Sequence, residues 1–499
     1  MALPSRRGRP ENVRWLLGLA VLTLCSWARF LGTGSVKIDE NYPTERFGTL
    51  LLLAMCAGWG LSVWGWAEIL ERPPQRPRRL AYAGLFVVCF MLPLLSNDLF
   101  ILFNQAFLTA HGRDVYTSAD SFPSGAWIAW VGERWRDNPS PYGPLTLLSA
   151  WPSVLGGTNP LLVELLLRLA WLLPLLAVME ASFRVFAHRP HFHAMLWLNP
   201  LWLVEGMGQL HPDLLGVLLV TAGILLRRRS PALGGAAAFS LATLCKWNLA
   251  FTLPWFWLSG THTLRQRLAR PALLLAMLSC LGTLAYAPFW RGPQSVAAPF
   301  RALQSKTLVP GGSVVDGVGA LSDALHGVVS DATVPVVQLV ERERARREGV
   351  WRVAQALMGL LALWALLGLA LSLRRGFDDE RLALVTGAFV VALVTLASPK
   401  FQSWYLMSAL PFFGLCCPAV WRRWWVLVVA ASVTEEFFLA LPRSALLFAP
   451  CVALSTLATL VAFLSALRSR YWGLPVWPVG ASADEAAAGL SGSALGRAP

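Results

Sequence analysis

Long runs of apolar residues with almost no charge recur along nearly the whole chain, and they constrain its fold more than any other feature. Residues 50–67, 271–290 and 355–373 are examples. Such runs are long enough, or nearly so, for a helix to cross a hydrocarbon core of about 30 Å. Only 14% of the residues are charged, whereas a soluble domain usually carries about a quarter. The pattern predicts an all-α, polytopic helical membrane protein. A closed β-barrel would need alternating apolar and polar residues, which the runs lack.

Arginine clusters separate the apolar runs and predict how the chain is threaded through the membrane. The formal net charge is +14, which in a soluble protein would suggest nucleic acid as a partner. Here the arginines gather in short loops, where they set topology by the positive-inside rule, so no nucleic-acid partner is expected. The eight cysteines all lie in apolar stretches, and no pair has the spacing of metal ligands or suits a disulfide.

The loop charges predict about 12–14 helices with both termini in the cytoplasm. One domain spans residues 1–470, and residues 471–499, rich in Ala, Gly and Ser, form a disordered cytoplasmic tail. Two large loops, about 97–160 and 291–349, are external. The clearest spans are about 15–31, 47–70, 80–96, 161–187, 271–290, 350–373, 381–398 and 403–420. Two pairs of runs are shorter than a usual span, about 192–206 with 211–226 and 232–245 with 247–258.

The first external loop contains two further apolar pieces. Residues 98–111 have apolar side chains at helical spacing, which predicts a helix lying in the membrane interface. Residues 142–156 are apolar but short and contain two prolines, so they predict a re-entrant or interfacial segment.

Several polar residues fall at the external ends of different predicted helices. Charges at a membrane are costly and are therefore functional candidates. These residues are Asp98, His211, Asp213, Lys246, Lys400, Gln402, Trp404 and Tyr405. Structural alternatives remain open, since Asp98 is also a favoured helix N-cap and His211-Pro212-Asp213 also suits a helix start. Glu164 and Arg168 are four residues apart and predict a structural ion pair. His188, His191 and His193 suit no single helix face, so a metal is not expected there.

The order of several short motifs resembles a known family. An acidic residue, Asp98, opens the first large external loop. It is followed by residues 110–116 (AHGRDVY), 142–145 (YGPL), 199–201 (NPL) and 211–213 (HPD). Later come Lys246 before Leu253-Pro254, and Ser398-Pro399 before Gln402, Trp404-Tyr405 and Leu410-Pro411. Together these resemble the GT-C superfamily of integral-membrane glycosyltransferases, and most of all the polyprenol-phosphate-mannose-dependent mannosyltransferases of bacteria.

This resemblance implies an enzyme of the bacterial inner membrane. It would transfer a hexose, mannose above all, with inversion from a polyprenyl phosphate donor to a glycan or glycolipid acceptor on the outer face. Asp98 would be the catalytic base that takes the acceptor proton. Lys246, Lys400 and Arg301 would bind the donor phosphate, whose charge grows in the transition state. The expected substrate-binding residues are Tyr116, Tyr142, His211, Asp213, Gln402, Trp404 and Tyr405. No metal or other cofactor is expected, and the helix over 99–111 would guide the prenyl chain.

Two other classes of protein fit parts of the pattern. A membrane transporter or lipid-linked sugar flippase would also need charges in the membrane and short broken helices. The large external loops and the lack of an internal repeat weigh against it. A non-catalytic scaffold subunit is the third alternative, and it would retain its role without Asp98.

Overall fold

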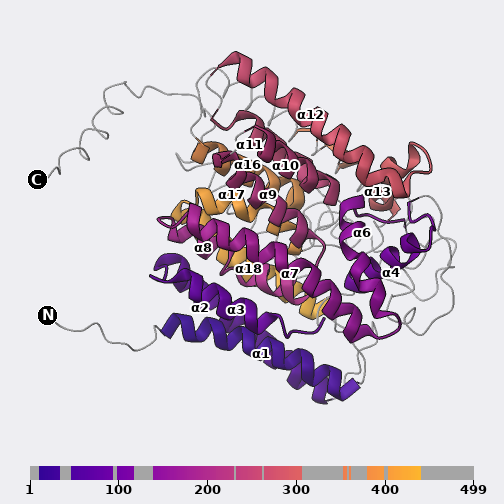
Figure 1. Ribbon diagram of the computed structural model, residues 1–499. Coiled ribbons are helices and arrows are strands. Elements are labelled where there is room, and N and C mark those ends of the chain that lie inside the picture. The colour runs from indigo at the N-terminus through magenta and orange to yellow at the C-terminus, as the bar shows by residue number, and fades with distance from the viewer. Residues whose placement is uncertain are drawn as a thin grey trace, which may run out of the picture.

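The chain folds as a bundle of helices (Figure 1). The computed structural model describes residues 10–33, 46–93, 98–116, 139–229, 232–260, 263–305, 379–397 and 403–439, with isolated positions at 352–353, 355–356 and 359–360. All regular structure in these ranges is helical, which confirms the all-α prediction. The predicted helix at 350–373 falls almost wholly outside the described ranges, and the predicted tail at 471–499 falls outside them completely.

Within the described ranges, four helices are long and apolar enough to cross a membrane. They are α1 (Pro10–Thr33), α2 (Arg46–Glu71), α7 (Pro160–Val185) and α12 (Leu264–Tyr286). The chain is therefore a multi-pass membrane protein. In Figure 1, α1 and α2 lie along one edge of the bundle and α12 along the opposite edge.

Small residues let α1 and α2 approach closely. A Cβ atom on Gly18 would lie 2.5 Å from the Gly58 carbonyl oxygen and 2.3 Å from the Ser62 hydroxyl. Membrane helices commonly associate through such small residues, because lipid supplies no hydrophobic drive between helices.

The prediction for the start of α12 was wrong. The apolar run begins at residue 271, yet the helix begins at Leu264 and takes Arg265, Arg267 and Arg270 into its first turns. A capping box explains the earlier start, because the Thr263 side chain accepts from the Gln266 backbone and the Gln266 side chain accepts from the Thr263 backbone.

The segment that leads to Asp98 also differs from prediction. Helix α3 (Pro77–Val88) ends eight residues before the predicted end at residue 96. Helix α4 (Asp98–Ala110) was predicted as a helix, but its burial within the protein was not predicted. Both of its faces are covered by protein, since its buried residues are Leu99, Phe100, Ile101, Leu102, Phe103, Asn104, Gln105, Ala106 and Leu108.

The two pairs of short runs are short helices that meet at breaks. Helix α8 (Pro190–Leu196) is followed by a π-helical segment, η3 (Trp202–Gly208), and by α9 (Asp213–Arg229). The axis turns by 115° between η3 and α9. The second pair is α10 (Leu233–Cys245) with η4 (Trp247–Thr252) and α11 (Leu253–Leu258). The piece at 142–156 contains α6 (Pro144–Ala150) and η2 (Trp151–Gly156), both too short to span a membrane.

The remaining helices come from the later part of the chain. Helix α13 (Gln294–Ser305) opens the predicted second loop and lies near α4 and α6 in Figure 1. Helix α16 (Asp379–Ala392) continues into a π-helical turn, η6 (Leu393–Ala397). The predicted span at 403–420 is not continuous: it contains η7 (Ser403–Ala409) and α17 (Leu410–Leu415), and α18 (Ala419–Leu439) follows. Pro411 at the start of α17 and Pro418 before α18 explain these breaks.

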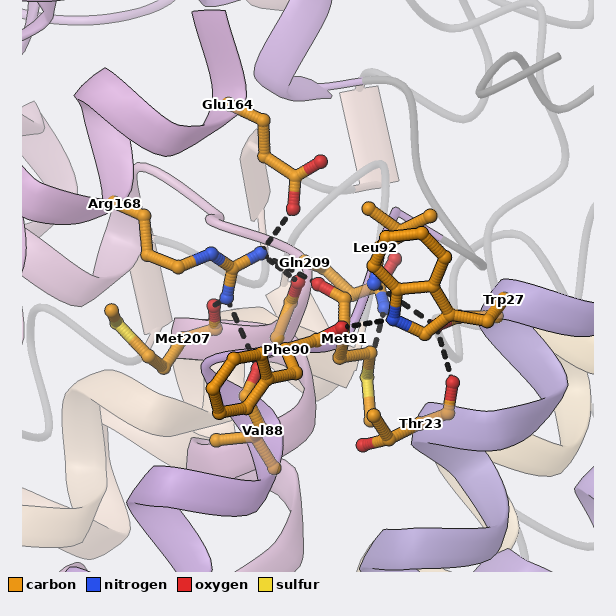
Figure 2. Close-up of polar contacts among 12 residues, drawn as sticks. Thr23, Trp27, Val88, Phe90, Met91, Leu92, Glu164, Arg168, Met207 and Gln209 are labelled. Atoms are coloured by element: carbon orange, nitrogen blue, oxygen red, sulfur yellow. Dashed lines mark hydrogen bonds and ion pairs between the residues drawn. The ribbon is translucent and has the colours of Figure 1, made fainter. Parts of the chain in front are cut away.

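Arg168 on α7 ties the break after α3 to the end of η3 (Figure 2). Its Nη1 donates to the carbonyls of Val88 at 3.1 Å and Met207 at 2.6 Å. Its Nη2 donates to the Met91 carbonyl at 2.6 Å and the Gly208 carbonyl at 3.3 Å, and it pairs with the Glu164 carboxylate. The predicted ion pair of Glu164 with Arg168 is thus confirmed. The guanidinium also satisfies carbonyl groups that the helix ends leave open.

Replacing Arg168 by Met should destabilise the fold strongly. The change leaves the buried Glu164 carboxylate without its partner and removes one donor from each of four carbonyls. We expect a loss of about 3–5 kcal/mol, as for a buried pair broken on one side. Arg184→Met on the same helix is the matched control. Arg184 pairs with Glu180 at 3.1 Å but is 72% exposed, so its loss should cost at most about 1 kcal/mol. Thermal unfolding in detergent measures both. Equal losses would contradict a central role for Arg168.

Candidate active site

Asp98 lies at the start of α4 and is held by Tyr142. The Tyr142 hydroxyl donates to Asp98 Oδ2 at 2.9 Å. Tyr142 stands just before α6 and is buried. Burial, helped by the Asp98 charge, raises the pKa of Tyr142 well above its ordinary value. The phenol therefore stays protonated and remains a donor to the Asp98 carboxylate.

The loop that carries Tyr142 is fixed from two sides. The Tyr116 hydroxyl donates to the Tyr142 carbonyl at 3.0 Å, and the Gly143 amide donates to the Cys245 carbonyl at 2.8 Å. A Cβ on Gly143 would lie 2.0 Å from the Leu244 carbonyl oxygen, so only glycine allows this approach. The end of α10 and the loop before α6 are therefore tightly joined.

His211 lies between two carboxylates. Its Nδ1 is 3.4 Å from Asp98 Oδ2, and its Nε2 is 3.1 Å from Glu205 Oε2. The Trp404 ring stacks on the imidazole, with centroids 3.8 Å apart and planes 21° from parallel. His211 and Glu205 are both fully buried. Asp98, by contrast, has a side chain that is 22% exposed, so it is the member of this group that a substrate can reach.

Lys246 lies beside this group and is already paired. Its Nζ is 2.8 Å and 2.7 Å from the two carboxylate oxygens of Asp213. The same ammonium lies 4.2 Å from the centre of the Tyr405 ring, a cation–π distance. His211 and Asp213 flank Pro212, and Trp404 adjoins Tyr405. The same two short segments therefore provide both the partners of Lys246 and the stacked rings of His211 and Trp404.

The structure brings together most of the residues predicted from sequence. Asp98, Tyr142, His211 and Trp404 form one set of direct contacts, and Asp213, Lys246 and Tyr405 form the adjoining set. Tyr116 contacts the loop of Tyr142 through its hydroxyl. Lys400 and Gln402 lie outside the described residues. Arg301 is on α13, but its side chain is outside the described part.

Glu205 was missed by the sequence prediction. It stands in η3, inside the apolar run 192–206, where it is the only acidic residue. That isolation in an apolar stretch was the available signal, since a buried charge in a membrane protein defaults to a functional candidate.

The three histidines before η3 do not gather. The His193 Nε2 donates to the Phe186 carbonyl at 3.0 Å, and its ring stacks on Phe183. His191 lies beside Arg422 instead. Among the residues that the structure describes, no three His, Cys, Asp or Glu side chains are placed to hold a metal ion. Metal-independent chemistry stays a prediction.

An apolar cavity of about 1070 Å³ opens next to the site. It lies between α10, η4, α12 and α13. Its wall includes Gly143, Leu244 and Trp247. Gly143 directly follows Tyr142 in the chain, and Leu244 and Trp247 enclose Cys245 and Lys246. Tyr286 on another wall packs against Tyr116, with ring centroids 5.9 Å apart. The cavity thus reaches the residues around Asp98 and Lys246, and aliphatic and aromatic side chains make up most of its lining.

Comparison with known proteins finds relatives that are named as mannosyltransferases. Residues 16–261 match a family model described as alpha-(1->6)-mannopyranosyltransferase, N-terminal domain. A protein of Mycobacterium tuberculosis named alpha-(1->6)-mannopyranosyltransferase A is 28% identical over 439 residues, which cover 81% of this chain and 80% of that protein. A Corynebacterium glutamicum protein of the same name is 26% identical over 37% of this chain and 39% of its own length.

The comparison with solved structures finds no significant match. The matched residues 16–261 include Asp98, Tyr142, Glu205, His211 and Lys246. The resemblance predicted from the motifs is confirmed by the family match and the two relatives, which support a bacterial mannosyltransferase of the GT-C type.

Proposed function

We propose that this mannosyltransferase takes mannose from a polyprenyl phosphate and transfers it with inversion to a glycan or glycolipid acceptor on the outer face of the plasma membrane. The observation that carries the proposal is the position of Asp98. Its partly exposed carboxylate is held by Tyr142 beside His211, next to Lys246 and to an apolar cavity. The relatives are named for an α-(1→6) product. Inversion to that product requires a donor of β configuration.

Asp98 acts as the general base. The acceptor hydroxyl must lose its proton as its oxygen attacks the anomeric carbon, and a carboxylate within hydrogen-bond reach accepts it. The bond between that carbon and the phosphate oxygen breaks, and its electron pair leaves with the lipid phosphate. The Tyr142 hydroxyl orients the carboxylate through its 2.9 Å hydrogen bond. A base held in this way is already oriented for proton transfer before the acceptor binds.

Lys246 stabilises the departing phosphate. A cation beside developing negative charge can lower a barrier by several kcal/mol in a site that excludes water. In the structure the ammonium is shared between Asp213 and the face of Tyr405. Asp213 therefore positions Lys246 for the donor, and this replaces the earlier prediction that Asp213 itself contacts substrate.

The prenyl chain of the donor lies in the apolar cavity. Leu244 and Trp247, which lie on either side of Lys246 in the chain, line the cavity. The prenyl chain of a donor whose phosphate lies near Lys246 would therefore enter the cavity directly. This assignment differs from the sequence prediction that the helix over 99–111 guides the chain, because α4 is covered on both faces. A lipid tail with its phosphate at Lys246 places the sugar toward Asp98.

The orientation follows from the positive-inside rule. Arginine clusters at one set of loops keep both termini in the cytoplasm, and Asp98, His211 and Lys246 then fall on the opposite side. A lipid-linked donor suits that side of a membrane, where nucleotide-sugars are not supplied.

The direct test gives purified protein in vesicles radiolabelled polyprenyl phosphate mannose, with polyprenyl phosphate glucose in parallel, and a mannan oligosaccharide as acceptor. We expect mannose transfer by the native protein and no transfer by Asp98→Asn, a loss of at least about 10²-fold. Thermal unfolding checks that the variant is folded. Linkage analysis identifies the product. Near-native transfer by folded Asp98→Asn would exclude Asp98 as the base, and movement of labelled lipid without product would favour the flippase alternative.

A second test separates two roles of Lys246. Lys246→Met should raise the donor KM and also destabilise the fold, because it leaves the buried Asp213 carboxylate unpaired, a cost of about 3–5 kcal/mol. The double variant Lys246→Met with Asp213→Asn should regain most of that stability without regaining donor use. The paired measurements are thermal unfolding and donor KM. Recovery of donor use together with stability would show that Lys246 does not bind the phosphate.

A third test fills the cavity. Gly282 on α12 lines it, and a Cβ there would meet only Leu244 Cδ2, at 3.8 Å. Gly282→Phe therefore projects a ring into the cavity with little backbone strain, and it should raise the KM of a long-chain donor by about 10-fold or more, the equivalent of about 1.4 kcal/mol. Gly60→Phe on α2 is the matched control, since Gly60 is exposed with nothing within 4 Å. An unchanged KM in Gly282→Phe would place the prenyl chain elsewhere.

A further inference from the structure

His211 is a buried imidazole with a carboxylate at each ring nitrogen. The distances are 3.4 Å from Nδ1 to Asp98 and 3.1 Å from Nε2 to Glu205. Both are ion-pair distances, although the N–H directions are not aligned as hydrogen bonds. Glu205 is fully buried in η3 and receives no aligned hydrogen bond within the described residues. A carboxylate taken out of water in this way needs a partner, and His211 is the partner at hand.

The number of protons on the imidazole of His211 limits which of its two nitrogens carries one. A neutral imidazole has a single N–H. If that N–H were on Nε2, the bare Nδ1 lone pair would face the Asp98 carboxylate, which is repulsive. With Asp98 ionised, as a general base must be, two arrangements avoid the repulsion: an imidazolium between two carboxylates, or a neutral ring with a protonated Glu205 donating to Nε2. In both arrangements the Nδ1 proton points toward Asp98.

The other groups around the ring fit the same arrangement. Trp404 of η7 stacks on one face of the imidazole and fixes its plane. Tyr142 donates to the same Asp98 oxygen that His211 approaches. The nearest other charges, Asp213 of α9 and Lys246 after α10, are paired with each other, and Tyr405 lies over that lysine. Glu205 is therefore the group that faces Nε2, the ring nitrogen on the side away from Asp98.

We propose that Glu205 is a positioning residue that holds His211 with its Nδ1 proton toward Asp98 and thereby fixes the carboxylate that receives the acceptor proton. The kinetic part of this inference rests on the proposed function. The proton balance is simple: the acceptor proton moves to Asp98 as the new bond to carbon forms, and the electron pair of the broken bond leaves with the phosphate. No proton moves to or from His211 or Glu205 in this step, and both act through position and charge.

The kinetic test is a double-mutant cycle with Glu205→Gln, His211→Gln and the double variant. A glutamine at position 205 can offer Nε2 either a donor or an acceptor, so it no longer holds the imidazole in one protonation state. We expect kcat to fall about 10- to 100-fold in Glu205→Gln, less than the loss of a general base, with the donor KM unchanged. In the His211→Gln background the second change should add little. Additive losses would show that Glu205 acts independently of His211 and would overturn the proposal.

Two comparison variants make the cycle specific. Glu180→Gln removes a carboxylate from α7 that pairs with Arg78 and Arg184, away from this site, and kcat should stay at the native value. Glu205→Asp keeps the carboxyl group and should retain more activity than Glu205→Gln. A Glu205→Asp variant that is no better than Glu205→Gln, while equally folded by thermal unfolding, would contradict a role for the carboxyl group in positioning.

A spectroscopic test needs neither donor nor acceptor. Nitrogen-15 resonances of the imidazole are recorded on the detergent-solubilised protein, and those of His211 are identified by their absence in His211→Gln. We expect a protonated Nδ1 in the native protein and a mixture of tautomers in Glu205→Gln. An unprotonated Nδ1 in the native protein would overturn the inference even if mannosyl transfer were established. The expected spectra without transfer would instead leave Glu205 positioned as described and reject the proposed function.

Discussion

The hydrogen bonds of Arg168 are the interaction on which the arrangement of the site depends. One guanidinium on α7 binds the carbonyls of Val88 and Met91, which lead toward Asp98, and those of Met207 and Gly208, which close η3. In Figure 2 the two segments converge on this side chain from different parts of the chain. Glu164 balances its charge. This tie anchors the segment before Asp98 and the end of the segment that carries Glu205 to one side chain.

Such a tie is required because the helices that supply the site are broken. A helix that ends inside a membrane protein leaves carbonyl and amide groups that lipid cannot satisfy. Here α3 ends at Val88, η3 ends at Gly208, and α10 ends at Cys245. Each break frees backbone groups and also delivers polar side chains at its edge. Arg168 caps the first two breaks, and the third is closed by the Gly143 amide and the Thr146 hydroxyl, both of which donate to the Cys245 carbonyl.

The sequence predicted the members of the site better than their partners. Asp98, His211, Lys246 and Trp404 stood out because polar residues at the ends of apolar runs are costly and therefore informative. The choice of partner is a three-dimensional property that spacing does not contain. Asp213 therefore appeared as a substrate contact, although it holds Lys246, and Glu205 was missed inside an apolar run. The burial of α4 was mispredicted for a related reason, since apolar residues at helical spacing suit a protein interior and a lipid interface equally well.

The charge balance of the described site bears on how the proposed phosphate donor would enter. Asp98, Asp213 and Glu205 bring three carboxyl groups, against the ammonium of Lys246 and the ring of His211. With Lys246 neutralised by Asp213, an anionic donor meets little net attraction from these side chains alone. Further cations are needed, or Asp213 must yield part of its hold on Lys246. The Trp404 ring stacks on His211. Lys400 stands only four residues before Trp404 in the chain. Because Trp404 is fixed against His211, the short connection limits how far the positive charge of Lys400 can lie from this site.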